Sequence, residues 1–184
     1  MAGHANLLII GVDPATAKGK LMAMALVHFY SSDDRVVYAY THERITESAT
    51  LDRITAWQRA LLRLMDVATI EMRRPLDMVA IEDARPRGRG GAHMQTLVTT
   101  LKETARRQGV RVELIPPGTV KKHATGRGNA EAAEVAMIVR AEYKGAESIP
   151  VVVGEYDVEA AVAIAGAGYA MLQEEWLKEA RDAQ

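Results

Sequence analysis

Three acidic residues stand at positions where their side chains can do chemistry. Asp13 directly follows the apolar run at residues 7–12, and Glu82 directly follows a second apolar run of strand length. A charged side chain that leaves a buried strand must reach solvent, a partner or a cation, because burying it unpaired is expensive. Asp157 opens a segment rich in small residues, of a kind that lets a helix lie close to a sheet. Each acid alone is explained by a loop start or a helix cap, but their matching positions favour a shared site.

The chemistry of such a site follows from the two strand-end acids. Ligands of α/β sheets collect at the carboxyl ends of the strands. If their strands are neighbours, Asp13 and Glu82 face each other, and two carboxylates repel unless a cation lies between them. Mg²⁺ suits oxygen ligands and keeps waters and substrate phosphates in its shell. The sequence therefore predicts a magnesium site, which Asp157 joins if its helix docks on the same sheet.

The elements that position these acids follow from the hydrophobic pattern. Strands are expected at residues 7–12, 21–30, 35–40, 78–81 and 110–115, and helices at residues 50–72, 93–108, 118–124, 130–143 and 157–180. The order predicts a mixed α/β fold, with three antiparallel strands followed by parallel strands in a five-stranded sheet flanked by helices. The chain of 184 residues fits one domain over residues 1–184.

Composition excludes several classes of protein. Hydrophobic residues make up 48% and charged residues 26%, which is typical of a globular domain. The chain has no cysteine, so it has no disulfide, thiolate metal site or cysteine nucleophile. No apolar run approaches the roughly 18 residues that a membrane span needs, and residues 1–6 lack a secretory pattern. We expect a cytoplasmic protein without a membrane partner.

Charge is distributed unevenly along the chain. Residues 85–127 carry ten Lys and Arg against two acidic residues, whereas the segments on either side are net negative. Such a segment indicates contact with a polyanion, or a solvated basic loop and helix face. The candidate phosphate contacts are Arg85, Arg87, Arg89, Lys122 and Arg127.

Four segments in this order and spacing resemble the RuvC-type Holliday-junction resolvases of the ribonuclease H-like superfamily. They are Ile10-Gly11-Val12-Asp13-Pro14, Val79-Ala80-Ile81-Glu82, the lysine-bearing and glycine-rich stretch at residues 116–139, and the acidic helix start at residues 157–165. The resemblance extends over about residues 7–170, nearly the whole chain. It implies a ribonuclease H-like fold.

The resemblance also implies an activity, namely metal-dependent cleavage of four-way DNA junctions in recombination and repair. Two Mg²⁺ ions, or Mn²⁺, would be held by Asp13, Glu82 and Asp157, and Lys121 would stabilise the charge that grows on the phosphate. Two matched cuts imply a homodimer. The apolar stripe of the helix at residues 93–108 is a candidate for the dimer interface, or for core packing. It consists of Met94, Leu97, Val98 and Leu101.

The sequence departs from the family pattern at three positions. Ala160 stands where a second acid is usual, three residues after Asp157. Glu159 points elsewhere by about two hundred degrees of helical rotation, so Glu159 or Glu155 would replace the missing acid only with a local change of geometry. In addition, Ala132 replaces a lysine, and Arg85 replaces an aromatic residue that probes the junction centre.

These departures keep other functions open. One is a catalytically weakened protein of this fold that binds branched DNA. Ala160 and Ala132 favour this function. Another is a nuclease of the same fold that acts on other branched DNA or on RNA hybrids. An actin-like phosphotransferase also begins with a strand that ends in an acid, but it needs a second domain, for which 184 residues leave no room.

Overall fold

The fold is built on a five-stranded sheet, seen in a computed structural model that describes residues 6–14, 21–44, 49–83, 90–150 and 155–183. The strands are β1 (Leu7–Asp13), β2 (Leu21–Phe29), β3 (Arg35–Arg44), β4 (Met78–Glu82) and β5 (Arg111–Ile115). Their order across the sheet is β3-β2-β1-β4-β5. The first three strands pair antiparallel, and β4 and β5 add in parallel. The predicted mixed α/β sheet is confirmed.

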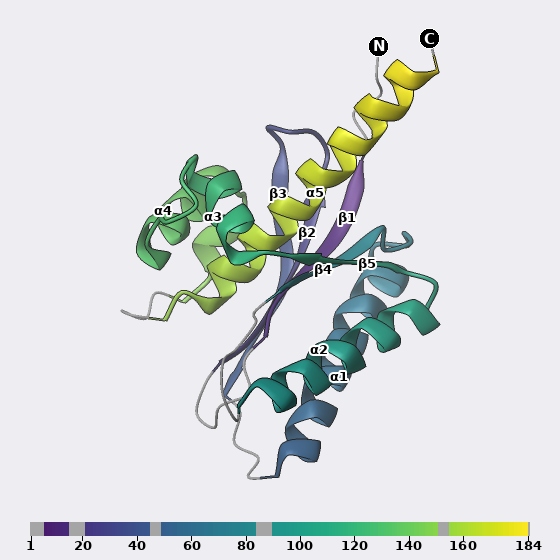
Figure 1. Cartoon of the computed structure of the whole chain (residues 1–184), viewed down its shortest axis with the longest axis vertical. Coiled ribbons are helices and arrows are strands. Elements are labelled where there is room, and N and C mark those ends of the chain that lie inside the picture. The colour runs from purple at the N-terminus through teal and green to yellow at the C-terminus, as the bar shows by residue number, and fades with distance from the viewer. Residues whose placement is uncertain (1–5, 15–20, 45–48, 84–89, 151–154, 184) are drawn as a thin grey trace.

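The sheet separates two layers of helices (Figure 1). One layer holds α1 (Thr50–Asp66), which continues into the π-helix η1 (Val67–Glu71), and α2 (Gly90–Arg107). The other layer holds α3 (Pro117–Thr125), α4 (Ala132–Glu142), the 3-10 turn η2 (Ala146–Ser148) and the long α5 (Asp157–Asp182). No helix in the described ranges is long and apolar enough to cross a membrane.

The central strand β1 belongs to both hydrophobic cores, because its side chains alternate between the two faces. Leu8 and Ile10 lie in the core under α1 and α2. Leu7 and Ile9 lie in the core under α5. All four side chains are buried, which explains why the sequence shows an unbroken apolar run here instead of an alternating one.

Helix α5 lies directly on β1, at a point where the strand has no side chain. A Cβ at Gly11 would come 1.9 Å from the carbonyl oxygen of Ala161 and 2.7 Å from the amide nitrogen of Ala165. Helix and strand backbones therefore touch, and α5 also packs on β2, β4 and α3. The stripe of small residues in the first half of α5 makes this approach possible.

Two elements differ from the sequence-based prediction in a way that has a physical cause. The helix predicted over residues 50–72 changes to a π-helix after Asp66, where the hydroxyl of Thr69 donates to the Met65 carbonyl at 3.0 Å and competes for a helical acceptor. Strand β3 runs beyond its predicted end to Arg44, because it stays paired with β2 as far as Leu21, and the buried Thr41 of this extension accepts a hydrogen bond from the Met24 amide at 3.1 Å.

The apolar stripe of α2 is part of the monomer's own core, so the interpretation of this stripe as a dimer interface is wrong. Met94, Leu97 and Leu101 are buried in the cluster that α1 and the sheet complete. Val98 packs partly buried against the same cluster. Helix α2 faces α1 and β5, and these neighbours leave the stripe inaccessible to a second copy.

Candidate active site

Asp13 and Glu82 leave the sheet side by side. The paired register of the parallel strands ends with Val12 beside Ile81, and the two acids are the next residue on each strand. Adjacent strands lie about 4.8 Å apart. The condition for a shared site, that the strands bearing the two acids are neighbours, is therefore met.

The two carboxylates also face the same layer of helices. Leu7 and Ile9 of β1 point into the core under α5, so the alternation of the strand places Asp13 on that face. Met78 and Ala80 of β4 point into the same core, and this places Glu82 on the same face. Both acids are half-buried.

Glu82 is held in an environment that disfavours its charge. Burial raises the pKa of the Glu82 carboxyl above its ordinary value, and the nearby Lys121 ammonium opposes this rise. Its backbone is fixed by pairing with Ile115 on β5, and the ladder continues as the Asp83 amide donates to the Ile115 carbonyl at 2.9 Å. A buried carboxylate beside one lysine is a group that a cation would stabilise in its charged form.

Lys121 reaches this place because α3 begins directly after β5. Pro116 and Pro117 turn the chain out of the strand, and Pro117 is tolerated at the first helical position, where no amide hydrogen is needed. The helix ends at Gly126, which adopts a left-handed conformation with φ 78°. Lys121 is half-buried on this short helix, whereas Lys122 is exposed.

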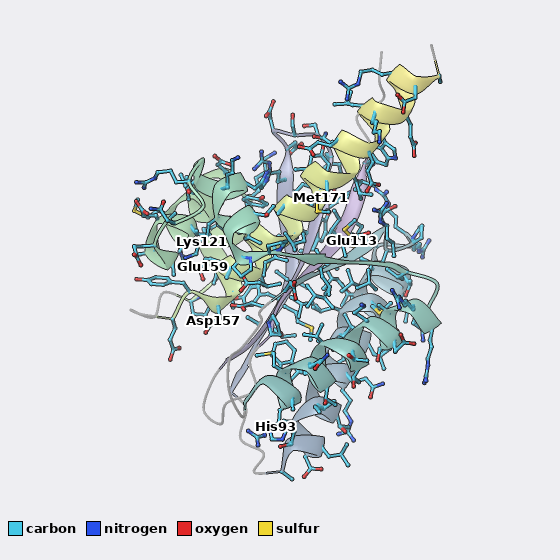
Figure 2. The ribbon with its side chains drawn as sticks, in the orientation of Figure 1. His93, Glu113, Lys121, Asp157, Glu159 and Met171 are labelled. Carbon is cyan, nitrogen blue, oxygen red and sulfur yellow. The ribbon has the colours of Figure 1, made fainter. Side chains whose placement is uncertain are left out.

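Asp157 is the first residue of α5, on the same side of the sheet as Asp13 and Glu82. Figure 2 shows Asp157 at the N-terminal end of α5 and Lys121 on the neighbouring α3. The contact of Ala161 with Gly11, one helical turn beyond Asp157 and two residues before Asp13, brings the start of this helix to the carboxyl end of β1. Within the described ranges, however, no three acidic or histidine side chains are arranged so that they could hold a metal ion.

Glu159 does not replace the acid that is missing at Ala160. Its side chain is 2% exposed and forms an ion pair with Arg140 of α4. Arg140 also donates to the Ile149 carbonyl at 3.1 Å and to the Pro150 carbonyl at 3.4 Å. The sequence-based inference that Glu159 points away from the Asp157 side is in accord with this pair. Glu155, which is half-buried just before α5, keeps its place as an alternative.

Sequence reasoning missed Arg140 as a residue that holds the start of α5. The sequence does show an arginine in an apolar helix and, further along, the acids Glu155, Asp157 and Glu159. Which of these acids pairs with the arginine could not be chosen without the tertiary structure. Its contacts tie α4, the segment before α5 and α5 itself together at the end where Asp157 begins the helix.

The basic residues of the sequence are only partly placed. Lys122 is exposed at the site, and the exposed Arg127 forms an ion pair with Glu134 at 2.5 Å. Glu134 in turn completes the capping box of α4 with Glu131. The predicted contacts Arg85, Arg87 and Arg89 lie outside the described residues.

Comparison with known structures identifies the architecture. The RuvC structure from Thermus thermophilus superposes with a TM-score of 0.68 and 17% identity, over 91% of this chain and 97% of that one. The chain has a RuvC-like, ribonuclease H-like fold. The predicted resemblance to RuvC is confirmed at the level of the fold. No protein-family model matches the sequence, and no curated protein matches it either.

Two viral proteins share the RuvC-like architecture. Fowlpox virus resolvase, solved with its substrate Holliday junction DNA, has a TM-score of 0.55 at 17% identity, over 90% of this chain and 99% of that one. The human cytomegalovirus terminase nuclease domain, soaked with manganese and bound to an inhibitor, has a TM-score of 0.56 at 15% identity, over 89% and 83%.

Proposed function

We propose that this chain is a divalent-metal-dependent endonuclease that hydrolyses phosphodiesters of four-way DNA junctions in recombination and repair. The observation that carries the proposal is the pairing of Asp13 and Glu82 at the ends of neighbouring central strands, on the face that also carries Lys121 and the start of α5. The fold shared with two junction resolvases supports the same choice.

The donor set suits Mg²⁺ or Mn²⁺. Asp13, Glu82 and Asp157 offer carboxylate oxygens, which are the ligands that these hard cations prefer. Asp13, Glu82 and Asp157 would together hold the ions. Bound ions would activate a water and stabilise the leaving oxygen.

The residues of the chain perform the remaining tasks in this proposal. Lys121 would balance the charge that develops on the phosphate, from a half-buried position where a charge interaction is stronger than in water. Lys122 and Arg127 would contact flanking phosphates, and Arg127 would exchange its ion pair with Glu134 for a phosphate. Arg85, Arg87 and Arg89, which follow Glu82 in the chain, remain proposed phosphate contacts.

A symmetric homodimer would supply two matched sites for the two cuts of a junction. The α2 stripe does not provide its interface. Light scattering of the protein with and without junction DNA measures the assembly, and one chain per junction in a productive complex would refute the dimer.

The test is cleavage of a synthetic mobile four-way junction with Mg²⁺ and with Mn²⁺, beside a linear duplex of the same sequence. We expect cleavage of the junction, and a loss of at least about a hundredfold with Asp13→Asn. Asp66→Asn, at an exposed position on the other face of the sheet, is the matched control and should cleave normally. An Asp13→Asn protein that cleaves at the wild-type rate would remove Asp13 from the proposed site.

Two other outcomes of this experiment point to different functions. Junction binding without cleavage in either metal would favour a DNA-binding function without catalysis. The burial of Glu159 and the alanine at position 160 support that alternative. Cleavage of duplex or other branched DNA at a similar rate would favour a nuclease with broader specificity, in line with the fold shared with a terminase nuclease domain.

A further inference from the structure

A pocket lies on the face of the sheet that α1 covers, at the end of the sheet opposite to Asp13. It has a volume of about 460 Å³, and its lining includes His28, Tyr30, Tyr38, Val67, Glu71 and Arg74. Phe29, the neighbour of His28, pairs with Leu7 at the start of β1, whereas Asp13 is its last residue. At about 3.3 Å per residue the two sites are roughly 20 Å apart.

Three aromatic rings form a continuous surface in this pocket. The ring centres of His28 and Tyr30 are 3.8 Å apart with the planes tilted by 37°, and those of His28 and Tyr38 are 5.8 Å apart. The hydroxyls of Tyr30 and Tyr38 share a hydrogen bond of 2.9 Å. Tyr30 is 39% and Tyr38 47% exposed, so these two rings are open to a ligand, whereas His28 is buried.

The backbone departs from regular structure at three places around this pocket. Leu26 pairs with Ala39 and Val27 with Val37, so Tyr38 is the extra residue of a β-bulge. Bulges re-aim side chains and are frequent beside functional sites. Val67 and Glu71 of the lining bound the π-helix, and Arg73 has a φ of 52°. Such irregularities cluster where a ligand or a switch uses them.

The pocket wall also carries a polar atom without a partner. His28 is 3% exposed, and its Nδ1 finds no hydrogen-bond partner among the described residues. The Nε2 atom of the ring lies 2.8 Å from Arg74 Nη1, which can only donate, and also contacts Asn6 Oδ1, which can only accept. Burial and the charge of Arg74 lower the pKa of His28, which favours the neutral ring.

We propose that this pocket binds an unpaired nucleotide, with its base stacked on Tyr30 and Tyr38 and its phosphate directed to Arg74. Aromatic surfaces stack any base, and a guanidinium is a strong partner for phosphate. Glu71 in the lining offers an acceptor for the amino group of a base. The nucleotide is either free or part of an unpaired DNA strand.

The test uses dAMP and a six-nucleotide deoxyadenosine strand as probes, measured by calorimetry in EDTA with the Asp13→Asn protein. Under these conditions binding at the proposed metal site is suppressed. Tyr38→Ala should weaken dAMP binding by at least about tenfold, as expected for the loss of a stacking surface. Trp176→Ala removes an aromatic side chain of similar exposure, 38%, on the distant α5 and should leave binding unchanged.

A second variant guards against a general effect of Tyr38→Ala. The double change Tyr30→Phe with Tyr38→Phe keeps both rings and should retain most of the binding. If the wild type binds the strand more tightly than dAMP, and Tyr38→Ala abolishes this difference, the natural ligand is an unpaired strand. If the two probes bind equally, the natural ligand is the free nucleotide. Absence of binding of both probes, or binding that Tyr38→Ala leaves intact, overturns the proposal.

Discussion

The backbone of Ala161 in α5 lies directly on Gly11 of β1, so that a single added carbon at Gly11 would come 1.9 Å from the Ala161 carbonyl oxygen. This contact sets the height of α5 above the sheet. It lies between Asp13, two residues along the strand, and Asp157, one turn back along the helix. The position of one proposed ligand relative to the other therefore depends on a residue that has no side chain.

Gly11→Ala should destabilise the protein by about 3 kcal/mol or more, because backbone atoms on both sides cannot move away from the new methyl group. Denaturant unfolding measures the loss. Gly118→Ala is the control, since its Cβ would find its nearest neighbour at 3.8 Å and alanine favours a helix. Equal stabilities of Gly11→Ala and the wild type would mean that α5 does not lie on β1 in this way.

Glu82→Gln should remove a dependence of stability on pH. Because the pKa of Glu82 is raised in the folded state, the folded chain binds the proton more tightly than the unfolded chain. The wild type should therefore lose stability relative to Glu82→Gln as pH rises from the ordinary glutamate pKa through the raised one. Unfolding of both proteins without metal over pH 4–8 measures the difference, with the exposed Glu174→Gln as control.

The same carboxyl should shape the pH dependence of cleavage. Below its raised pKa Glu82 is protonated and a poor metal ligand, so the wild-type rate should fall on the acid side. Glu82→Gln should be inactive across the range, with a loss of about a hundredfold or more. A Glu82→Gln protein with a wild-type rate at neutral pH would exclude this carboxylate from catalysis.

Lys121 and Lys122 form a matched pair of adjacent lysines with different expected roles. Lys121→Met should lower the cleavage rate by about a hundred- to a thousandfold, as for loss of one charge-stabilising donor. It should also move the acid limb of the pH profile to higher pH, because the Lys121 charge holds the pKa of Glu82 down. Single-turnover cleavage over a pH series measures both effects.

Lys122→Met should affect binding instead of rate, since Lys122 is exposed and would contact only a flanking phosphate. The slope of junction affinity against salt should fall by about one unit. If both methionine variants show the same loss of rate and an unchanged pH profile, Lys121 has no special role.

Arg140→Met should cost about 3 kcal/mol of stability, because it leaves the Glu159 carboxylate buried without its partner. The double variant with Glu159→Met should recover most of this loss. Breaking the more exposed pair of Arg35 with Glu142, by Glu142→Gln, should cost less than about 1 kcal/mol. Thermal unfolding compares the three.

Cleavage by Glu159→Gln distinguishes a structural from a catalytic glutamate. Its rate per folded molecule should equal that of the wild type, because the side chain is committed to Arg140. A rate that falls as far as that of Asp13→Asn would instead make Glu159 a metal ligand.

The sheet could be predicted from the sequence because its strands are short apolar runs that end in charged or turn residues. Residues 7–12 and 78–81 are buried on both faces, and this produces a pattern that a helix of the same length rarely has. The position of Asp13 beside Glu82 was expected on the condition that their strands are neighbours, and the order of the strands meets this condition. Each of these inferences depends on local sequence and on a topological rule.

The features that escaped prediction depend on contacts between distant segments or on backbone irregularities. Arg140 and Glu159 are both visible in the sequence, but their pairing requires α4 to pack on α5. The π-helix after α1 and the bulge at Tyr38 change neither the composition nor the periodicity enough to be recognised. The pocket that they border was therefore invisible at the level of the sequence.

The order of synthesis gives the contact between α5 and β1 one more consequence. Strand β1 is synthesised well before the helix that covers one of its faces, because α5 follows all the other described elements in the chain. Until α5 has been made, the apolar surface that includes Leu7 and Ile9 is not covered, and the nascent chain needs protection from aggregation. By the same logic, a chain that ends before α5 would lack Asp157 and would leave the side chains of Leu7 and Ile9 uncovered.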